Sequence, residues 1–70
     1  MNPYKLIGKC YCRTKAEAFE LMEKFFDDTN GMGISVDGEY LFVTGLIDGR
    51  GARLTYRPRN GKLTMHYFRH

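Results

Sequence analysis

No stretch of about 18 consecutive apolar residues occurs in this chain, which excludes an ordinary membrane-spanning helix. The first residues also lack the apolar segment of a secretion signal, so we expect a cytoplasmic protein with no membrane partner. Tryptophan is absent, and the two cysteines are Cys10 and Cys12. Because residues two apart in a strand point the same way and would form a strained disulfide, we expect both thiols to be reduced.

Acidic residues are missing from the last third of the chain. Residues 50–70 hold six Lys and Arg side chains and no carboxylate, for a charge of +6. Residues 1–49 hold eight acidic and five basic side chains, for a charge of −3, so the whole chain has a net charge of +3. This asymmetry favours an anionic partner for the C-terminal part, with a solvated basic edge that aids solubility as the alternative.

Seventy residues suffice for one small domain with a thin core and leave little room for a deep pocket. The sequence contains no internal repeat, low-complexity tract or linker, so we expect residues 1–70 to form a single domain. Its pattern predicts an α+β fold in the order β-α-β-β-β-β, with one amphipathic helix packed on a four- to five-stranded antiparallel sheet.

The only stretch with a helical pattern spans residues 14–30. Thr14 and Glu17 have the spacing of a capping box, and the residues that follow are good helix formers. Apolar side chains recur at helical spacing and define one face: Ala18, Phe19, Leu21, Met22, Phe25 and Phe26. We expect this face to pack on a sheet rather than in a partner's groove, and the helix to end at Asn30-Gly31, a left-handed cap signal.

Glycine after aspartate or asparagine marks three tight turns in the second half of the chain, at residues 37–38, 48–49 and 60–61. These turns separate strands expected over residues 34–36, 39–46, 52–57 and 62–69. Another strand, over residues 4–12, precedes the helix, and residues 32–33 form a short connector. The result is an antiparallel meander of four strands that follows a strand and a helix.

Two-residue turns fix how these strands pair, and the pairing can be checked against the apolar pattern. They predict the pairs Ile34–Leu41, Val43–Leu54 and Tyr56–Met65. All three registers bring one apolar set to the same face: Ile34, Val36, Leu41, Val43, Leu54, Tyr56, Leu63, Met65 and Tyr67. Gly45 faces Ala52 on that side, which leaves room for the helix to approach. A three-residue last loop would instead put Leu54 opposite His66, so the agreement among the turns supports the fold.

The first strand is expected at an edge of the sheet, with one side toward the helix. That inner side holds Tyr4, Leu6, Gly8, Cys10 and Cys12. The outward side holds Lys5, Ile7, Lys9, Tyr11 and Arg13. Two arrangements remain open: antiparallel to the last strand, or parallel to the strand at residues 34–36 through a right-handed crossover.

One helix covers one face of a sheet, so the opposite face is expected to be open. That face combines aromatic and basic side chains, whereas a solvated face would hold mainly threonine, lysine and glutamate. The residues expected to bind a partner there are Lys5, Lys9, Tyr11, Tyr40, Phe42, Arg53, Arg57, His66 and Phe68. The partner could be a protein surface, nucleic acid with bases on the rings and phosphates on the cations, or a second copy in a homodimer. A solvated face without a partner is the fourth interpretation.

The hexamer at residues 41–46, LFVTGL, resembles the first-strand RNA-contact motif of RNA-recognition-motif domains. Arg50-Gly51, followed by Leu54 and Tyr56, resembles the second motif of that family. In that family a helix separates the two motifs, whereas a tight turn separates them here, and the expected strand order also differs. We therefore do not assign the chain to this family or transfer its RNA-binding residues.

Metal binding and catalysis find little support in the sequence. Cys10, Cys12, His66 and His70 could form a two-cysteine, two-histidine zinc set, but Cys-x-Cys is tighter than the usual spacing. The expected strands also put His66 on the face opposite to the cysteines, which leaves either thiol without a base. The aspartates are better explained as helix-end and turn residues. We therefore expect no metal, no cofactor and no enzymatic activity.

The sequence predicts a small non-catalytic binding protein. A domain of this size with one adhesive face often acts as a stoichiometric inhibitor or regulator, of the kind that phages and other mobile elements use against host defence or nucleic-acid-processing complexes. Direct binding of RNA or DNA by the same face is the alternative. The two differ in their response to salt, because phosphate contacts make nucleic-acid binding strongly salt-dependent.

Overall fold

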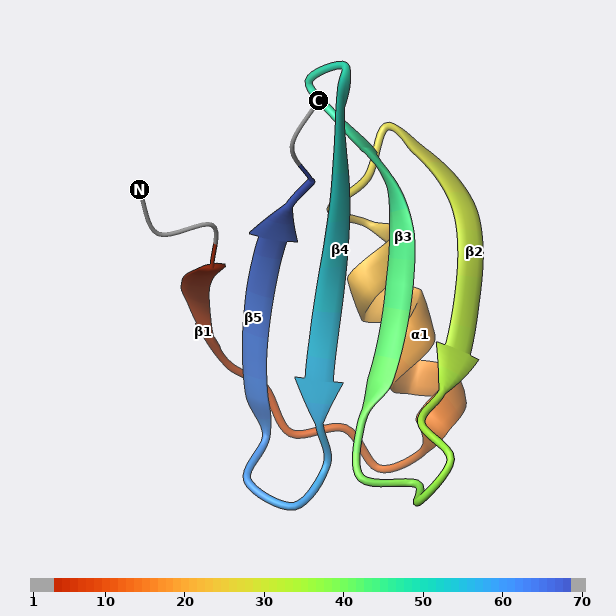
Figure 1. Ribbon diagram of the computed structural model, residues 1–70. Coiled ribbons are helices and arrows are strands. Elements are labelled where there is room, and N and C mark those ends of the chain that lie inside the picture. Colours follow the sequence, from red (N-terminus) through yellow and green to blue (C-terminus); the bar gives the residue numbers. More distant parts are fainter. Residues whose placement is uncertain (1–3, 69–70) are drawn as a thin grey trace.

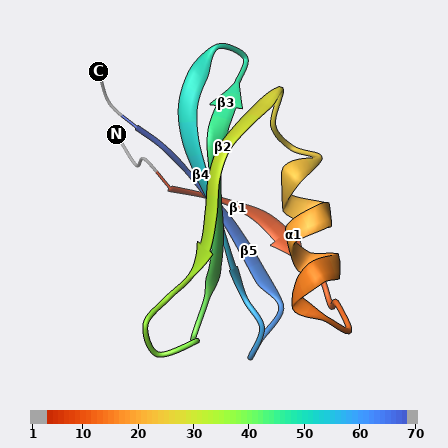
Figure 2. The same ribbon diagram turned by 90° about the vertical axis from the view of Figure 1, so that its right-hand side faces the viewer.

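One helix packs on one face of a five-stranded antiparallel sheet in the computed structural model, which describes residues 4–68 and side chains from Ile7 onward (Figure 1). The elements are β1 (Tyr4–Lys9), α1 (Lys15–Glu23), β2 (Asp28–Ile34), β3 (Leu41–Ile47), β4 (Arg50–Arg57) and β5 (Lys62–Tyr67). The strand order across the sheet is β1-β5-β4-β3-β2. The predicted α+β fold and the predicted order of elements are confirmed. Figure 2 shows α1 on one side of the sheet and the other side uncovered by any described element.

α1 begins where the sequence predicts and ends earlier. The hydroxyl oxygen of Thr14 accepts from the N–H of Glu17 at 3.2 Å, which caps the helix start. After Glu23 the backbone tightens, because the N–H groups of residues 24–26 bond to carbonyls three residues back. The expected end at Asn30 is wrong, since the Asp, Thr, Asn and Gly residues that follow are poor helix formers and pair in the sheet instead.

β2 is the element that the sequence interpretation missed. Residues 28–33, assigned to helix and connector, pair antiparallel with β3. The N–H of Asp27 donates to the carbonyl of Leu46 at 2.8 Å, and its carboxylate accepts from the N–H of Asp48 at 2.8 Å. These two bonds turn the chain from the helix into the sheet.

The predicted pair of Ile34 with Leu41 is confirmed, but the expected two-residue turn is a loop over residues 35–40. Val36 lies in this loop and is fully exposed, and Ile34 is 44% exposed. Both were expected in the core. α1 packs mainly against β3, so Ile34 at the end of β2 is only partly covered.

The turn at Asp48-Gly49 is confirmed as a two-residue hairpin turn, with both residues at positive φ (52° and 75°). It pairs Val43 with Leu54 as predicted. Gly45 faces Ala52, also as predicted, but the close approach there comes from β2 rather than from α1. A Cβ on Gly45 would overlap the carbonyl oxygen of Asp28.

The last turn is longer than the sequence predicts. Residues 58–61 form the loop between β4 and β5, closed by a bond of 2.8 Å from the N–H of Gly61 to the carbonyl of Arg57. Tyr56 therefore pairs with Leu63 and Leu54 with Met65, which corrects the predicted pairing by two residues. Because side chains alternate between faces with a period of two, every β5 side chain keeps its predicted face.

β1 runs antiparallel to β5 at the edge of the sheet, which is one of the two arrangements that the sequence left open. Its register shifts between Leu6 and Gly8, and Gly8 has a φ of 129°. This irregularity changes which way the strand's side chains point. Ile7, predicted to face outward, packs against the core instead.

The core lies between α1 and the sheet. Its buried side chains are Ala18, Met22, Leu41, Val43, Ala52, Leu54, Tyr56, Leu63 and Met65. The hydroxyl of Tyr56 donates to the carbonyl of Cys10 at 3.1 Å and accepts from the N–H of Cys12 at 3.4 Å. The buried ring thus anchors the segment that leads into α1. Within residues 4–68, no helix has the length and apolar character needed to cross a membrane.

Candidate binding face

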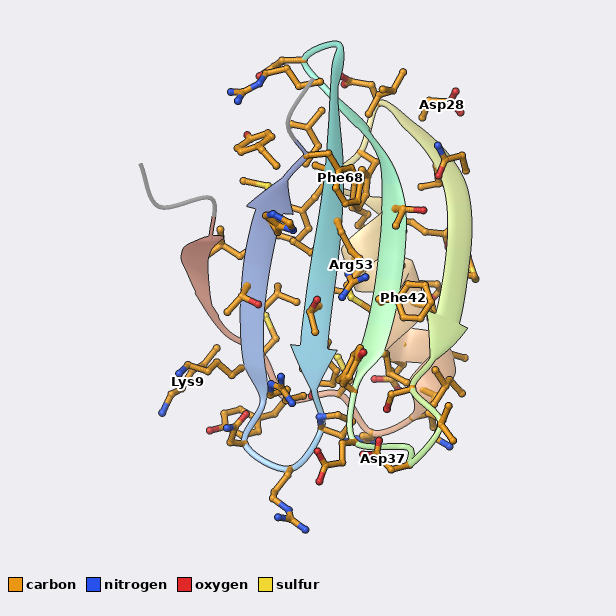
Figure 3. The ribbon with its side chains drawn as sticks, viewed as in Figure 1. Lys9, Asp28, Asp37, Phe42, Arg53 and Phe68 are labelled. Carbon is orange, nitrogen blue, oxygen red and sulfur yellow. The ribbon has the colours of Figure 1, made fainter. Side chains whose placement is uncertain are left out.

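The outer face is the side of the sheet opposite α1. It is formed by Tyr40, Phe42, Thr44, Leu46, Gly51, Arg53, Thr55, Arg57, Lys62, Thr64, His66 and Phe68. Cross-strand pairing arranges most of these residues in rows, such as Thr44–Arg53–His66 and Phe42–Thr55–Thr64. Together with Lys9 on β1, which lies opposite Lys62, seven of the predicted binding residues therefore share this face, and Figure 3 shows it from the front.

Arg53 occupies the middle of the outer face, between Phe42 and Phe68 (Figure 3). It lies opposite Thr44 on β3 and His66 on β5 and is half-buried. Its guanidinium carbon is 5.5 Å from the centroid of the Phe42 ring. A cation over a ring at this distance is stabilised by about 0.5–1 kcal/mol, which helps to hold the side chain in place. The planar guanidinium carries five N–H donors suited to a carboxylate or phosphate.

Phe42 is held from two directions. Arg53 lies over its ring, and on the β2 side a Cβ on Gly33 would come within 2.7 Å of the ring's Cζ atom. The ring therefore lies across Gly33. Arg57 and Tyr40 repeat the pairing of cation and ring, with 5.3 Å from guanidinium carbon to ring centroid.

Phe68 forms the other aromatic end of the outer face. Its N–H donates to the carbonyl of Gly51 at 2.9 Å, and a Cβ on Gly51 would lie 3.3 Å from its ring. The rings of Phe68 and His66 meet edge to face, with centroids 5.5 Å apart. Phe68 and Leu46 are 39% and 40% exposed, so this end presents apolar surface.

A row of three basic residues crosses the opposite end of the outer face. Lys9 on β1 lies opposite Lys62 on β5, which lies opposite Arg57 on β4. All three are exposed, and neighbouring strands are about 5 Å apart. No acidic side chain belongs to the outer face of β3–β5, and the nearest carboxylates to this row are Asp37 and Glu39, which line a hollow with Arg57. Lys62 was missing from the predicted binding residues, although strand alternation alone would have placed it beside Thr64.

Two predicted binding residues do not join these rows. The strand expected over residues 4–12 ends at Lys9, so Tyr11 lies beyond the sheet with its ring against Gly61, at 2.7 Å from where a Cβ would be. Tyr11 is 75% exposed. The side chain of Lys5 lies outside the described residues, and its backbone is opposite Met65.

Two loops border a shallow hollow of about 300 Å³ next to the basic row. Its lining residues are Asp37, Gly38, Glu39, Arg57, Pro58, Arg59 and Asn60. Ligand pockets are usually enclosed and largely apolar with a few convergent polar groups. This hollow mixes carboxylates with guanidinium groups at the surface, so we assign it no ligand.

Asp37 organises the loop over residues 35–40. Its Oδ1 accepts from the N–H of Glu39 at 3.0 Å and from the hydroxyl of Ser35 at 2.8 Å. These bonds, in that order, hold the pKa of Asp37 below its ordinary value near 3.8. A carboxyl group whose pKa is lowered by folding stabilises the folded state above its ordinary pKa.

We expect Asp37→Asn to lower the melting temperature at pH 7 and to have a smaller effect at about pH 3 and below. The carboxylate's contribution is lost as the pH falls through its lowered pKa, so wild type and variant converge in acid. Thermal unfolding followed by circular dichroism at both pH values measures this. A difference in melting temperature that stays constant with pH would contradict the assigned role of the charge.

The thiols and the histidine that were considered as zinc ligands lie on opposite sides of the sheet. Cys10 and Cys12 are free thiols packed against the core, whereas His66 is on the outer face opposite Arg53. Over residues 4–68, no cluster of three or more His, Cys, Asp or Glu side chains could hold a metal ion. His70 lies outside the described residues.

Comparison with protein-family models, with curated proteins and with solved structures gives no match for this chain. The two stretches that resemble RNA-recognition motifs lie on β3 and β4, which are neighbours joined by a two-residue turn. The function is therefore inferred from the outer face itself.

Proposed function

We propose that this chain is a small non-catalytic binding protein that covers part of another protein's surface with its outer face, as a stoichiometric inhibitor or regulator. The supporting observation is Arg53, half-buried between Phe42 and Phe68 in the middle of a sheet face that no described element covers. Arginine and aromatic residues at the centre of a patch dominate many protein–protein binding energies. The partner surface should offer carboxylates to Arg53 and Arg57, and apolar groups to the two rings.

The ring contacts favour a protein partner over stacked bases. Arg53 lies over Phe42, and Arg57 lies over Tyr40. Base stacking needs an open ring face, which these contacts restrict. A carboxylate needs only the N–H edge of the guanidinium group, and a charge-assisted pair of this kind is among the stronger hydrogen bonds.

Nucleic acid is the second candidate partner, and the row of Lys9, Lys62 and Arg57 favours it. Three cations on neighbouring strands, without a carboxylate among them, could follow a phosphate backbone. The threonines between this row and Arg53 could donate to phosphate or sugar oxygens. Both candidate partners would occupy the same face, so one molecule cannot bind a protein and a nucleic acid there at the same time.

Fluorescence anisotropy separates the two candidates. Labelled single-stranded RNA, single-stranded DNA and duplex DNA are titrated with the chain at two salt concentrations. If the partner is a protein, we expect the labelled nucleic acids to bind the chain no more tightly than about 100 µM at physiological salt, the weak end of non-specific binding. Tight binding that falls with salt, with a slope of about −0.7 to −0.9 per phosphate contacted, would replace the first candidate with the second. The immobilised chain should capture its protein partner from the source cell in a saturable complex.

A further inference from the structure

We infer that the free edge of β2 is a second binding surface, which accepts an extended, positively charged segment of a partner protein as an added strand. This surface borders the outer face of the proposed function at the ring of Phe42, which lies across Gly33 of β2. β2 is the last strand in the order β1-β5-β4-β3-β2, and no other strand between residues 4 and 68 pairs with its far side. Figure 2 looks onto this edge and shows β2 in front of the sheet, with α1 to one side.

The edge of β2 has unpaired backbone groups and little protection. Every second residue of an edge strand points its N–H and C=O away from the sheet. Many proteins guard such edges with lysine or proline, yet β2 has the sequence DTNGMGI, without either. The register shifts between Thr29 and Gly31, so the regular part of the edge runs over residues 31–34. Peptides that extend a sheet bind to edges of this kind.

Apolar groups lie on both sides of this edge. Met32 and Ile34 point to the α1 side, because their partners on β3 are buried core residues, but they remain 50% and 44% exposed. On the outer side Gly33 has no side chain, and the ring of Phe42 lies across it. An added strand would therefore cover apolar surface above and below its backbone.

Charge indicates what kind of strand fits. Residues 25–49 contain no Lys, Arg or His and hold five carboxylates: Asp27, Asp28, Asp37, Glu39 and Asp48. Asp28 begins β2, and Asp37 lies in the loop that follows it, at the opposite end of the edge (Figure 3). A second copy that paired its β2 with this one would bring two acidic segments together. A partner strand with basic residues near both ends would offset these charges instead.

An NMR titration of the ¹⁵N-labelled chain with two peptides tests this inference. One peptide has alternating valine and threonine between two terminal lysines, and the other has glutamates in place of the lysines. Addition of each peptide to about 5 mM detects binding in the millimolar range. We expect the lysine peptide to shift the amide signals of residues 31–34 and to bind at least about tenfold more tightly than the glutamate peptide.

Two matched substitutions locate the site. Ile34→Lys should weaken binding of the lysine peptide about tenfold or more, whereas Val36→Lys, which adds the same charge in the adjoining loop, should change it less than about threefold. Arg53→Glu, on the outer face, should leave the shifts of residues 31–34 in place. This independence separates a failure of the β2 inference from a failure of the proposed function.

Three outcomes would overturn the inference. Equal binding of the two peptides, or no binding at 5 mM, would show that the edge does not select a basic strand. Peptide-induced shifts centred on Phe42 and Arg53 without changes at residues 31–34 would place binding on the outer face. Shifts of residues 31–34 that depend on protein concentration alone would indicate pairing with a second copy.

Discussion

Leu54→Ala is expected to lower the free energy of unfolding by about 2–5 kcal/mol. Leu54 is fully buried on the central strand β4, opposite Val43 on one side and Met65 on the other. Truncation removes apolar burial and leaves a cavity that the neighbouring strands cannot close without moving the backbone. Because the total stability of a small domain is on the order of 5 kcal/mol, the variant should lose most of it. Urea unfolding followed by circular dichroism measures the change.

Thr55→Ala is the matched control for this experiment. Thr55 is the next residue on β4, lies on the outer face and is half-exposed, so its truncation should cost about 0.5 kcal/mol or less. The two variants remove side-chain atoms from opposite faces of the same strand. Equal losses at both positions, or a loss at Leu54 below about 0.5 kcal/mol, would contradict the face assignment.

Arg53→Glu is expected to weaken binding of the protein partner by about 2–4 kcal/mol, or roughly 30-fold or more. The substitution replaces the central cation of the outer face with an anion, so a carboxylate on the partner would be repelled instead of bound. Phe42→Ala and Arg57→Ala each remove one neighbouring contact and should weaken binding by smaller amounts, about 1–2 kcal/mol. Titration of the partner captured from the source cell, by calorimetry or surface binding, gives the affinities.

Arg13→Glu makes the same change of charge away from the outer face. Arg13 is exposed and precedes α1, so its reversal should leave partner affinity within about threefold of wild type. The urea midpoint of Arg13→Glu should match the wild type, and Arg53→Glu should lose no more than about 1 kcal/mol, the contact with the Phe42 ring, because neither side chain belongs to the core. If Arg13→Glu weakens binding as much as Arg53→Glu, net charge rather than the outer face governs the interaction.

The residues of the tight turns accounted for most of the fold that the sequence could predict. The turn at Asp48-Gly49 correctly predicted the pairing of β3 with β4. The predicted pair of Ile34 with Leu41 is also confirmed, although the loop between these two residues is longer than expected. The loop at residues 58–61 shifted the β4–β5 pairing by two residues, yet an even shift preserves the faces. Seven of the nine candidate binding residues were correctly assigned to the outer face: Lys9, Tyr40, Phe42, Arg53, Arg57, His66 and Phe68.

Tertiary pairing decided what the sequence could not reveal. The stretch DTNGMG in β2 has one strand-forming residue, Thr29, and no apolar alternation, and its strand conformation depends on hydrogen bonds to β3. The bulge at Ile7 likewise has no signal apart from Gly8. Local propensity favoured a longer helix and an uninterrupted first strand, and pairing with neighbouring strands overrode both.

The position of β1 also bears on how the chain assembles. Tyr4 lies opposite His66, so this pair of strands closes nearly the whole chain into one loop, whereas β2 to β5 are joined by short connections. The entropy cost of closing a loop rises with its length, and contacts distant in sequence form more slowly than local ones. The meander should therefore fold first as a unit of local hairpins, and docking of β1 against β5 should be the closing step. Native-state opening that begins at β1 would leave the central cation of the outer face and the β2 edge intact.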